Sequence, residues 1–372
     1  MRSSMLGASP WRRAETFYRV RETNITRKQW RWAALAGIAA IAVLIVIRFR
    51  HDGPVFDWAV FAATFSGLDW GWLALASILA YATYFGRALR WAVFLRPLRP
   101  HPGMWNLVKA TIIGFTAIVL LGRPGEFVRP YLISVKEGVP LTSQLAAWFL
   151  ERIFDLLLAL FIFGYGLSRL SVSHGHVGGP ALQWLFLVGG RLVWILSALC
   201  LGLLVFLRHY PELFRARLVG ALGFLDEHRL ARVEGLIGAF LQGVESIRST
   251  LAVVLVLGFT ILEWILIAAC YFCILKSFNG PVRFSPIDIF IYMGFVAVGT
   301  VVQLPGIGGG MQVVSVLVLH EIFGIPVEIA TSMSLVIWIT TFIILLPIGI
   351  PLALHEGINW NKLKALRKEA PL

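Results

Sequence analysis

Charged side chains are scarce in this 372-residue chain, where they make up 14% of the residues. An average soluble domain carries about 25%. Hydrophobic residues make up 58%, and the mean hydropathy is +0.79. So few polar side chains cannot cover a surface exposed to water, which excludes an ordinary soluble domain. We therefore interpret the chain as an all-α integral membrane protein, in which lipid surrounds most of the apolar surface.

Cysteine is also rare, and its three residues, Cys200, Cys270 and Cys273, all lie in apolar segments. That placement argues against a disulfide framework. Cys270 and Cys273 have no second ligand pair nearby, so we expect small residues packing in a helix and not a metal site. The His-Glu pairs at His320 and His355 lack the second His of a zinc protease motif, and there is no phosphate-binding loop for ATP. We expect no metal and no cofactor, and transport that is passive or ion-coupled.

Acidic residues are outnumbered, with 20 Asp and Glu against 33 Lys and Arg and a net charge of +13. The basic residues lie in short hydrophilic stretches between long apolar runs. This placement favours contact with anionic lipid headgroups and argues against nucleic acid as a partner. We therefore expect a membrane lipid as the main partner.

Long apolar runs predict six membrane spans. Their approximate ranges are 32–47, 70–95, 145–170, 182–207, 251–275 and 327–354. Two further apolar stretches, 105–121 and 287–304, run into Gly- and Pro-rich breaks and resume as helices too short to cross, at 127–135 and 311–323. Because Gly and Pro interrupt a helix, we interpret both as re-entrant hairpins.

Lys and Arg are concentrated on one side of this arrangement, which predicts the topology. The basic segment 1–31, the region around Arg96, the stretch 208–248 and the basic tail 355–372 are expected to be cytoplasmic. Apolar residues recur at helical spacing between 210 and 248, which predicts amphipathic helices on the cytoplasmic surface. The protein is accordingly expected to be a multi-pass protein of the cell (inner) membrane with both termini in the cytoplasm.

The predicted order is span, span, hairpin and span, and it then repeats. In the membrane domain 32–354, repeat one covers 32–170 and repeat two covers 182–354. The first unit starts inside and the second starts outside, so the hydropathy predicts an inverted repeat. Inverted repeats recur among transporters.

Charges at the first break are candidates for function, because charge at membrane depth is costly. Arg123, Glu126 and Arg129 lie three residues apart, so a helical continuation stacks them on one face. The planar guanidinium suits phosphate, and a broken helix offers free backbone N–H donors. We predict a lipid-headgroup site that includes these three residues and Arg152.

Acidic residues inside the spans are candidates for ion coupling or ion pairing. Glu151 and Asp155 lie within one turn of span 145–170, and Glu263 lies near the middle of span 251–275. For Glu126, Glu151 and Asp155 a structural role is the alternative, in which they neutralise nearby bases and attach the hairpin to the bundle.

The second break carries no charge. Gly306, Gly308 and Gly309 permit positive φ and close approach of the backbone, so their amides are candidates for headgroup binding, with Gln312 as a neutral hydrogen-bonding group. The alternative is a tight re-entrant turn without a ligand.

Three motifs in order carry a family resemblance: GRPGEFVR at 122–129, ERIFD at 151–155 and LPGIGG at 304–309. Over residues 30–355 the chain resembles the transmembrane region of lysylphosphatidylglycerol synthases, a flippase-like family. The resemblance implies movement of a lipid between leaflets. The separate aminoacyltransferase domain of full-length synthases is expected to be absent, and lysyl-lipid synthesis is not expected.

The chain departs from the family pattern at two places. Met311-Gln312 stand where many relatives carry Arg-Glu, and Trp338 stands where an arginine is expected. We predict a non-enzymatic flippase-like transporter of a phosphate-bearing or isoprenoid-type lipid, with lipid-synthesis enzymes as further partners. The alternatives are an intramembrane lipid-modifying enzyme, with Glu151, Asp155 or Glu263 as acid or base, and a non-transporting accessory subunit of a lipid-synthesis complex.

Overall fold

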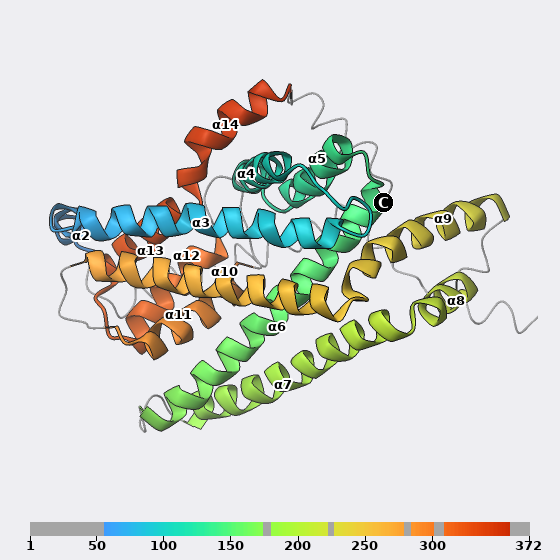
Figure 1. The fold of residues 1–372 in the computed structure, drawn as a ribbon. Helices are drawn as coiled ribbons and strands as arrows, with labels where there is room; N and C mark the ends of the chain where they lie inside the picture. The colour runs from blue at the N-terminus through green and yellow to red at the C-terminus, as the bar shows by residue number, and fades with distance from the viewer. Residues whose placement is uncertain (1–55, 174–179, 222–226, 279–283, 301–308, 358–372) are drawn as a thin grey trace, which may run out of the picture. The chain divides into compact units, whose positions relative to one another are not determined.

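The computed structural model describes residues 56–173, 180–221, 227–278, 284–300 and 309–357 (Figure 1). The chain divides into two units, Met1–Phe56 and Asp57–Leu372, and every helix described belongs to the second. The predicted basic segment 1–31, the predicted span 32–47, the tail 358–372 and the break residues 301–308 lie outside the described residues.

The described part of the chain is helical throughout, which confirms the all-α prediction, and it contains one isolated β-bridge, between Leu68 and Phe278. The helices are α2 (Trp58–Ser66), α3 (Trp70–Leu95), α4 (Met104–Leu121), η2 (Arg123–Phe127), α5 (Val128–Glu137), α6 (Leu141–Ser173), α7 (Pro180–His209), α8 (Pro211–Ala221), α9 (Glu227–Val244), η3 (Glu245–Ile247), α10 (Thr250–Ser277), α11 (Pro286–Gly299), α12 (Gly310–Leu317), η4 (Val318–Ile322), α13 (Val327–Thr341), η5 (Ile343–Leu345) and α14 (Leu346–His355).

Four helical segments of the described residues are long and apolar enough to cross a membrane. They are Trp70–Leu95, Met104–Leu121, Thr250–Ser277 and Val327–His355. A fifth is possible on length and composition if the bent pair α7 and α8 counts as one span. The chain is therefore a multi-pass membrane protein.

Helix boundaries follow local chemistry. Asp69 caps α3, where its carboxylate accepts hydrogen bonds from the backbone N–H groups of Gly71 at 2.8 Å and Trp72 at 3.4 Å. Asp57 caps α2 in the same way. Side-chain oxygens of this kind satisfy the N–H groups that a helix start leaves unpaired. The short helix α2, which lies between Asp57 and Asp69, was not predicted.

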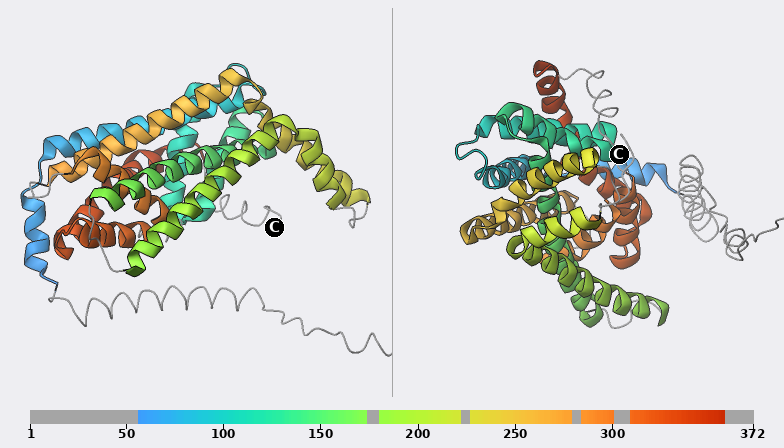
Figure 2. Two further views of the ribbon diagram at one scale, coloured as in Figure 1. Left: turned by 90° about the horizontal axis from the view of Figure 1, so that it is seen from below. Right: turned by 90° about the vertical axis from the view of Figure 1, so that its right-hand side faces the viewer.

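The long helices α3 and α10 pack side by side in opposite directions (Figures 1 and 2). Near the start of α3, the Lys276 ammonium lies 4.2 Å from the centre of the Trp72 ring. Near its end, Arg90 donates a hydrogen bond to Thr260 at 3.0 Å. The start of α3 thus meets the end of α10, and a later part of α3 meets an earlier part of α10, so the two helices are antiparallel. Helices α6 and α7 form a second long pair.

The chain doubles back after α4. Gly122 has a φ of 70°, a conformation that side chains disfavour, and it ends α4 and begins η2. A Cβ atom at Gly125 would collide with the backbone of Ala117, and one at Gly114 would lie 2.6 Å from the Cβ of Arg129. Glycine thus lets η2 and α5 fold closely against α4.

The chain also doubles back between α11 and α12. A Cβ atom at Gly299 would lie 2.8 Å from the carbonyl oxygen of Gly310. Gly309, which begins α12, has φ 74° and ψ −128°, close to the φ 70° and ψ −146° of Gly122. The helix that follows each predicted break therefore begins at a glycine in a similar backbone conformation.

Apolar side chains form two separate cores. One joins the end of α3 to α4, α5, α6 and the start of α10. The other joins the start of α3 and the end of α10 to α11, α12 and α13. Because α3 and α10 contribute to both cores, the stretch between the two apolar zones lies near the middle of this helix pair.

Candidate functional site

A cluster of charged side chains lies at the edge of the first core and reaches that middle stretch through Arg87 of α3 and Glu263 of α10. Its centre is Arg90 on α3, which is fully buried. The Arg90 guanidinium donates to Glu151 at 2.6 Å and to Asp155 at 2.6 Å, both on α6. It also lies 3.1 Å from the Glu263 carboxylate on α10. One arginine therefore holds three acidic residues from two helices.

Three further arginines surround these acids. Arg129 on α5 forms a buried ion pair with Glu151. Arg87, one turn before Arg90, lies 2.5 Å from Glu263. Arg152 lies 3.1 Å from Asp155, and its side chain is 38% exposed. The cluster joins four helices, namely α3, α5, α6 and α10.

Guanidinium groups outnumber carboxylates in this cluster, four to three. The Nε atoms of Arg87, Arg90 and Arg152 are buried and have no hydrogen-bond acceptor among the described residues. Both Glu263 oxygens also lack a hydrogen bond within the same residues, although they lie at ion-pair distance from two arginines. A surplus cation with unused donors can accept an additional anion.

Aromatic rings line the cluster on one side. The Arg129 guanidinium lies 4.2 Å from the centre of the Trp91 ring and 5.4 Å from that of Phe115. Arg87 lies 4.7 Å from the same Phe115 ring. Stacking on aromatic faces stabilises these cations and limits their rotation, so the donors are held in place before any ligand arrives.

The three charges at the first break do not share a surface. Arg123 pairs with Glu126 at 2.9 Å and is 51% exposed, whereas Arg129 is buried in the central cluster. The prediction that a helical continuation stacks all three on one face is therefore wrong in its geometry. The 3-10 helix 123–127 does place Arg123 and Glu126 on one face. It ends before Arg129, which belongs to α5 and packs against Gly114 of α4.

The two breaks approach each other through Arg123, which donates a hydrogen bond to the carbonyl oxygen of Thr300 at 3.3 Å. Thr300 is the last described residue before the second break. Gly306 and Gly308 lie outside the described residues, while Gly309 begins α12 and Gln312 is partly buried, with its carbonyl oxygen 3.3 Å from the Ser334 hydroxyl.

Arg87 and Arg90 were not among the predicted site residues. They lie three residues apart and are the charged residues of the predicted span 70–95. A charge within an apolar span is the same signal that identified Glu263. It would have found both arginines.

A second group of ion pairs joins α4, α5 and the end of α14. The Glu356 carboxylate lies 2.6 Å from the Lys136 ammonium and 3.2 Å from that of Lys109. Hydrogen bonds from Lys136 and, to a lesser extent, Lys109 lower the pKa of Glu356. The stability from these pairs is therefore present at neutral pH and is lost as the pH falls below the ordinary range for glutamate.

A curated relative supports the membrane assignment. The chain is 26% identical to a UPF0104 membrane protein of Methanothermobacter thermautotrophicus over 291 residues, which cover 76% of this chain and 82% of that protein. No solved structure matches the chain. The family model described as "Lysylphosphatidylglycerol synthase TM region" matches residues 32–349. The buried charges therefore lie within the matched region, and the chain belongs to the lysylphosphatidylglycerol synthase transmembrane-region family.

Proposed function

We propose that this protein is a flippase-like transporter that moves a phosphate-bearing or isoprenoid-type lipid between the leaflets of the membrane. One observation carries the proposal. A cluster with one more guanidinium than carboxylate is buried at the edge of the first apolar core, and three of its Nε donors lack an acceptor among the described residues. A lipid headgroup with a phosphate supplies both the missing negative charge and the missing acceptors. The family of membrane proteins to which the chain belongs agrees with a role in lipid metabolism or transport.

We further propose an architecture of six spans and two opposed re-entrant hairpins in an inverted repeat. The glycines that begin η2 and α12 share one backbone conformation, as equivalent positions in two repeats would. The pairing of α3 with α10 joins the second span of each proposed repeat in antiparallel fashion. The third span of each proposed repeat also packs against the hairpin of the other repeat. Helix α6 packs on α11, where Gly166 contacts Ile291. Helix α14 packs on α4, where Gly349 contacts Thr116.

In this proposal the headgroup reaches the cluster by way of two partly exposed arginines, one at the first break and one at the edge of the cluster. Arg123 and Arg152 make the first contact with the phosphate, and the acyl chains stay in lipid while the headgroup crosses. Glu263 is the proposed coupling group, because its carboxylate has the fewest hydrogen bonds of the three buried acids. Glu151 and Asp155 hold Arg90 and Arg129 in place.

The proposed orientation places both termini, the Arg96 region and helices α8 and α9 in the cytoplasm, and α2 outside. Single cysteines introduced as Ser66→Cys on α2 and Arg217→Cys on α8 test it, since both positions are exposed and the three native cysteines are buried. In intact cells an impermeant thiol reagent is expected to label position 66 and to label position 217 only after lysis. Labelling of position 217 before lysis would reverse the orientation.

Reconstitution tests the function itself. The full-length protein is placed in liposomes that contain one of a panel of fluorescent lipids, and a membrane-impermeant quencher reports the fraction in each leaflet. We expect faster exchange for at least one phosphate-bearing or isoprenoid lipid than in protein-free liposomes. Glu263→Gln is expected to alter the pH dependence of that exchange. If no lipid on the panel moves faster than in protein-free liposomes, the proposed function is wrong.

A further inference from the structure

A groove between α6, α7 and α10 is separate from the charge cluster. Its volume is about 370 Å³, and its walls are almost entirely apolar, with Leu157, Phe161, Leu201 and Leu257 among them. The lining extends over about two turns of α6 and of α7, which corresponds to about 10 Å along each helix. A groove of this shape and polarity suits an acyl chain.

One end of the groove is cationic. Along α7 the lining changes from Leu201 and Val205 to Arg208 and His209 in the last helical turn. Arg208 donates a hydrogen bond to the hydroxyl of Thr250, the first residue of α10, at 2.8 Å. The end of one long apolar helix and the start of another therefore meet at this point. In a membrane this is where lipid phosphates lie, because charged residues at helix ends lie at the interface.

A polar recess adjoins the cationic end. It measures about 150 Å³ and lies where α7 bends by 100° into α8 and where α9 leads into η3. Leu207 and Arg248 line the recess, while their chain neighbours Arg208 and Ile247 line the groove. The groove and the recess are therefore direct neighbours, separated by the chain at residues 207–208 and 247–248.

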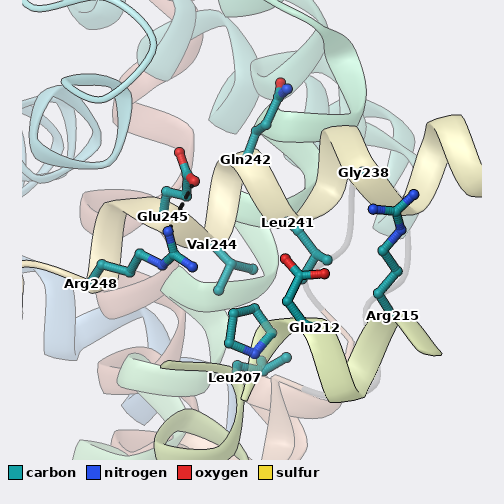
Figure 3. Close-up of a pocket in the computed structure, with 10 residues that line it drawn as sticks. Leu207, Glu212, Arg215, Gly238, Leu241, Gln242, Val244, Glu245 and Arg248 are labelled. Atoms are coloured by element: carbon teal, nitrogen blue, oxygen red, sulfur yellow. Dashed lines mark hydrogen bonds and ion pairs between the residues drawn. The ribbon is translucent and has the colours of Figure 1, made fainter. Parts of the chain in front are cut away.

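The recess offers charges of both signs. In Figure 3, Glu212 and Arg215 extend from α8 toward α9, and a dashed line joins Glu245 to Arg248, whose carboxylate and guanidinium lie 3.3 Å apart. No ion pair engages Glu212 within the described part of the chain. A headgroup with an ammonium can therefore pair with Glu212 while its phosphate contacts a neighbouring arginine.

We infer that the groove and the recess together bind one glycerophospholipid with an amine in its headgroup. An acyl chain occupies the groove, the phosphate contacts Arg208, and the ammonium contacts Glu212. The order of these groups along the lipid matches their order along the protein, from the apolar wall of α7 through its last turn to α8. The inference goes beyond the proposed function, because a lipid can bind here whether or not the protein transports it.

Native mass spectrometry of the full-length protein tests the inference. The detergent-solubilised protein is incubated with equal amounts of phosphatidylethanolamine and phosphatidylglycerol that carry the same acyl chains. We expect wild type to retain the ethanolamine lipid preferentially. Leu201→Trp fills the groove and Arg208→Gln removes the phosphate contact, and each is expected to weaken retention by about tenfold, which is the effect of losing about 1.4 kcal/mol. Glu212→Gln is expected to abolish the preference for the amine.

Two exposed positions outside the lining provide matched controls. Leu199→Trp adds the same bulk to α7, and Arg217→Gln removes the same charge from α8. Both are expected to retain lipid like wild type, and size-exclusion chromatography checks that every variant is folded. A phosphatidylethanolamine with a photoreactive acyl chain provides a second measurement, and its crosslinks are expected in peptides of α6, α7 and α10.

The outcomes separate this inference from the proposed function. If Leu201→Trp and Arg208→Gln retain lipid like wild type, or if crosslinks fall outside these helices, the site is wrong even where transport is observed. A preference for phosphatidylglycerol would overturn the assignment of the amine. If reconstituted protein moves no lipid but Leu201→Trp still loses retention, the site stands and the transport proposal fails.

Discussion

Arg90→Met is expected to cost about 3–5 kcal/mol of stability, the typical effect of removing one partner from a buried ion pair. Arg90 contacts Glu151, Asp155 and Glu263, and its removal takes the cation that these acids share away from two helices. The expected result is a large loss of folded protein in the membrane fraction and a lower unfolding temperature. Accumulation and thermal unfolding, both followed by size-exclusion chromatography in detergent, provide the measurement.

The matched control for this variant lies on the same segment. Arg96→Met removes an exposed arginine at the end of α3 and is expected to change stability by less than about 0.5 kcal/mol. Arg90→Lys keeps the charge but lacks the planar fork, so an intermediate effect is expected. An Arg90→Met protein that accumulates and unfolds like wild type would show that the cluster does not hold the helices together.

The double variant Arg123→Gln and Arg152→Gln is expected to slow lipid exchange by about 100-fold or more. The reason is the loss of charge-assisted contacts to phosphate, each worth about 1.5–3 kcal/mol. Folding should change little, because both side chains are partly exposed and Asp155 keeps its pairing with Arg90. Quenching of a fluorescent lipid in proteoliposomes measures the exchange, at equal amounts of incorporated protein.

Arg217→Gln on the exposed surface of α8 is the control for lost positive charge, and wild-type exchange is expected. The contrast between the two predictions separates the role of a buried arginine from that of two partly exposed ones. Arg90 acts on stability, whereas Arg123 and Arg152 act on the lipid. Wild-type exchange by a normally folded double variant would remove these arginines from the headgroup site.

Several features of the fold could be predicted from the sequence alone, because they depend on local patterns. Apolar length placed α3 at 70–95, and the structure has the same bounds. The predicted range 182–207 corresponds to α7, and 251–275 corresponds to α10, with ends that differ by two residues or fewer. Glycine and proline marked the breaks after α4 and α11, since these residues interrupt helices wherever the chain later folds.

The partners of the charged residues could not be predicted in this way. Arg152, the neighbour of Glu151 and Asp155 in sequence, does pair with both acids. Arg90 from a different helix lies closer to them, at 2.6 Å from each, and sequence spacing does not predict that contact. Arg129 was grouped with Arg123, but it contacts Glu151 and Trp91 instead. Spacing along one helix determines which side chains share a face, but it does not determine which other helix meets that face.

The tertiary structure alone decided how the halves of the chain come together. The antiparallel pairing of α3 with α10 brings Arg90 to Thr260, which is 170 residues away in sequence. That pairing depends on complementary packing of the two helices, a property of their surfaces together that neither sequence segment carries alone. Hydropathy predicted a membrane protein and the ends of α3, α7 and α10, because burial in lipid depends on composition. The charge cluster exists because helices distant in sequence pack around it.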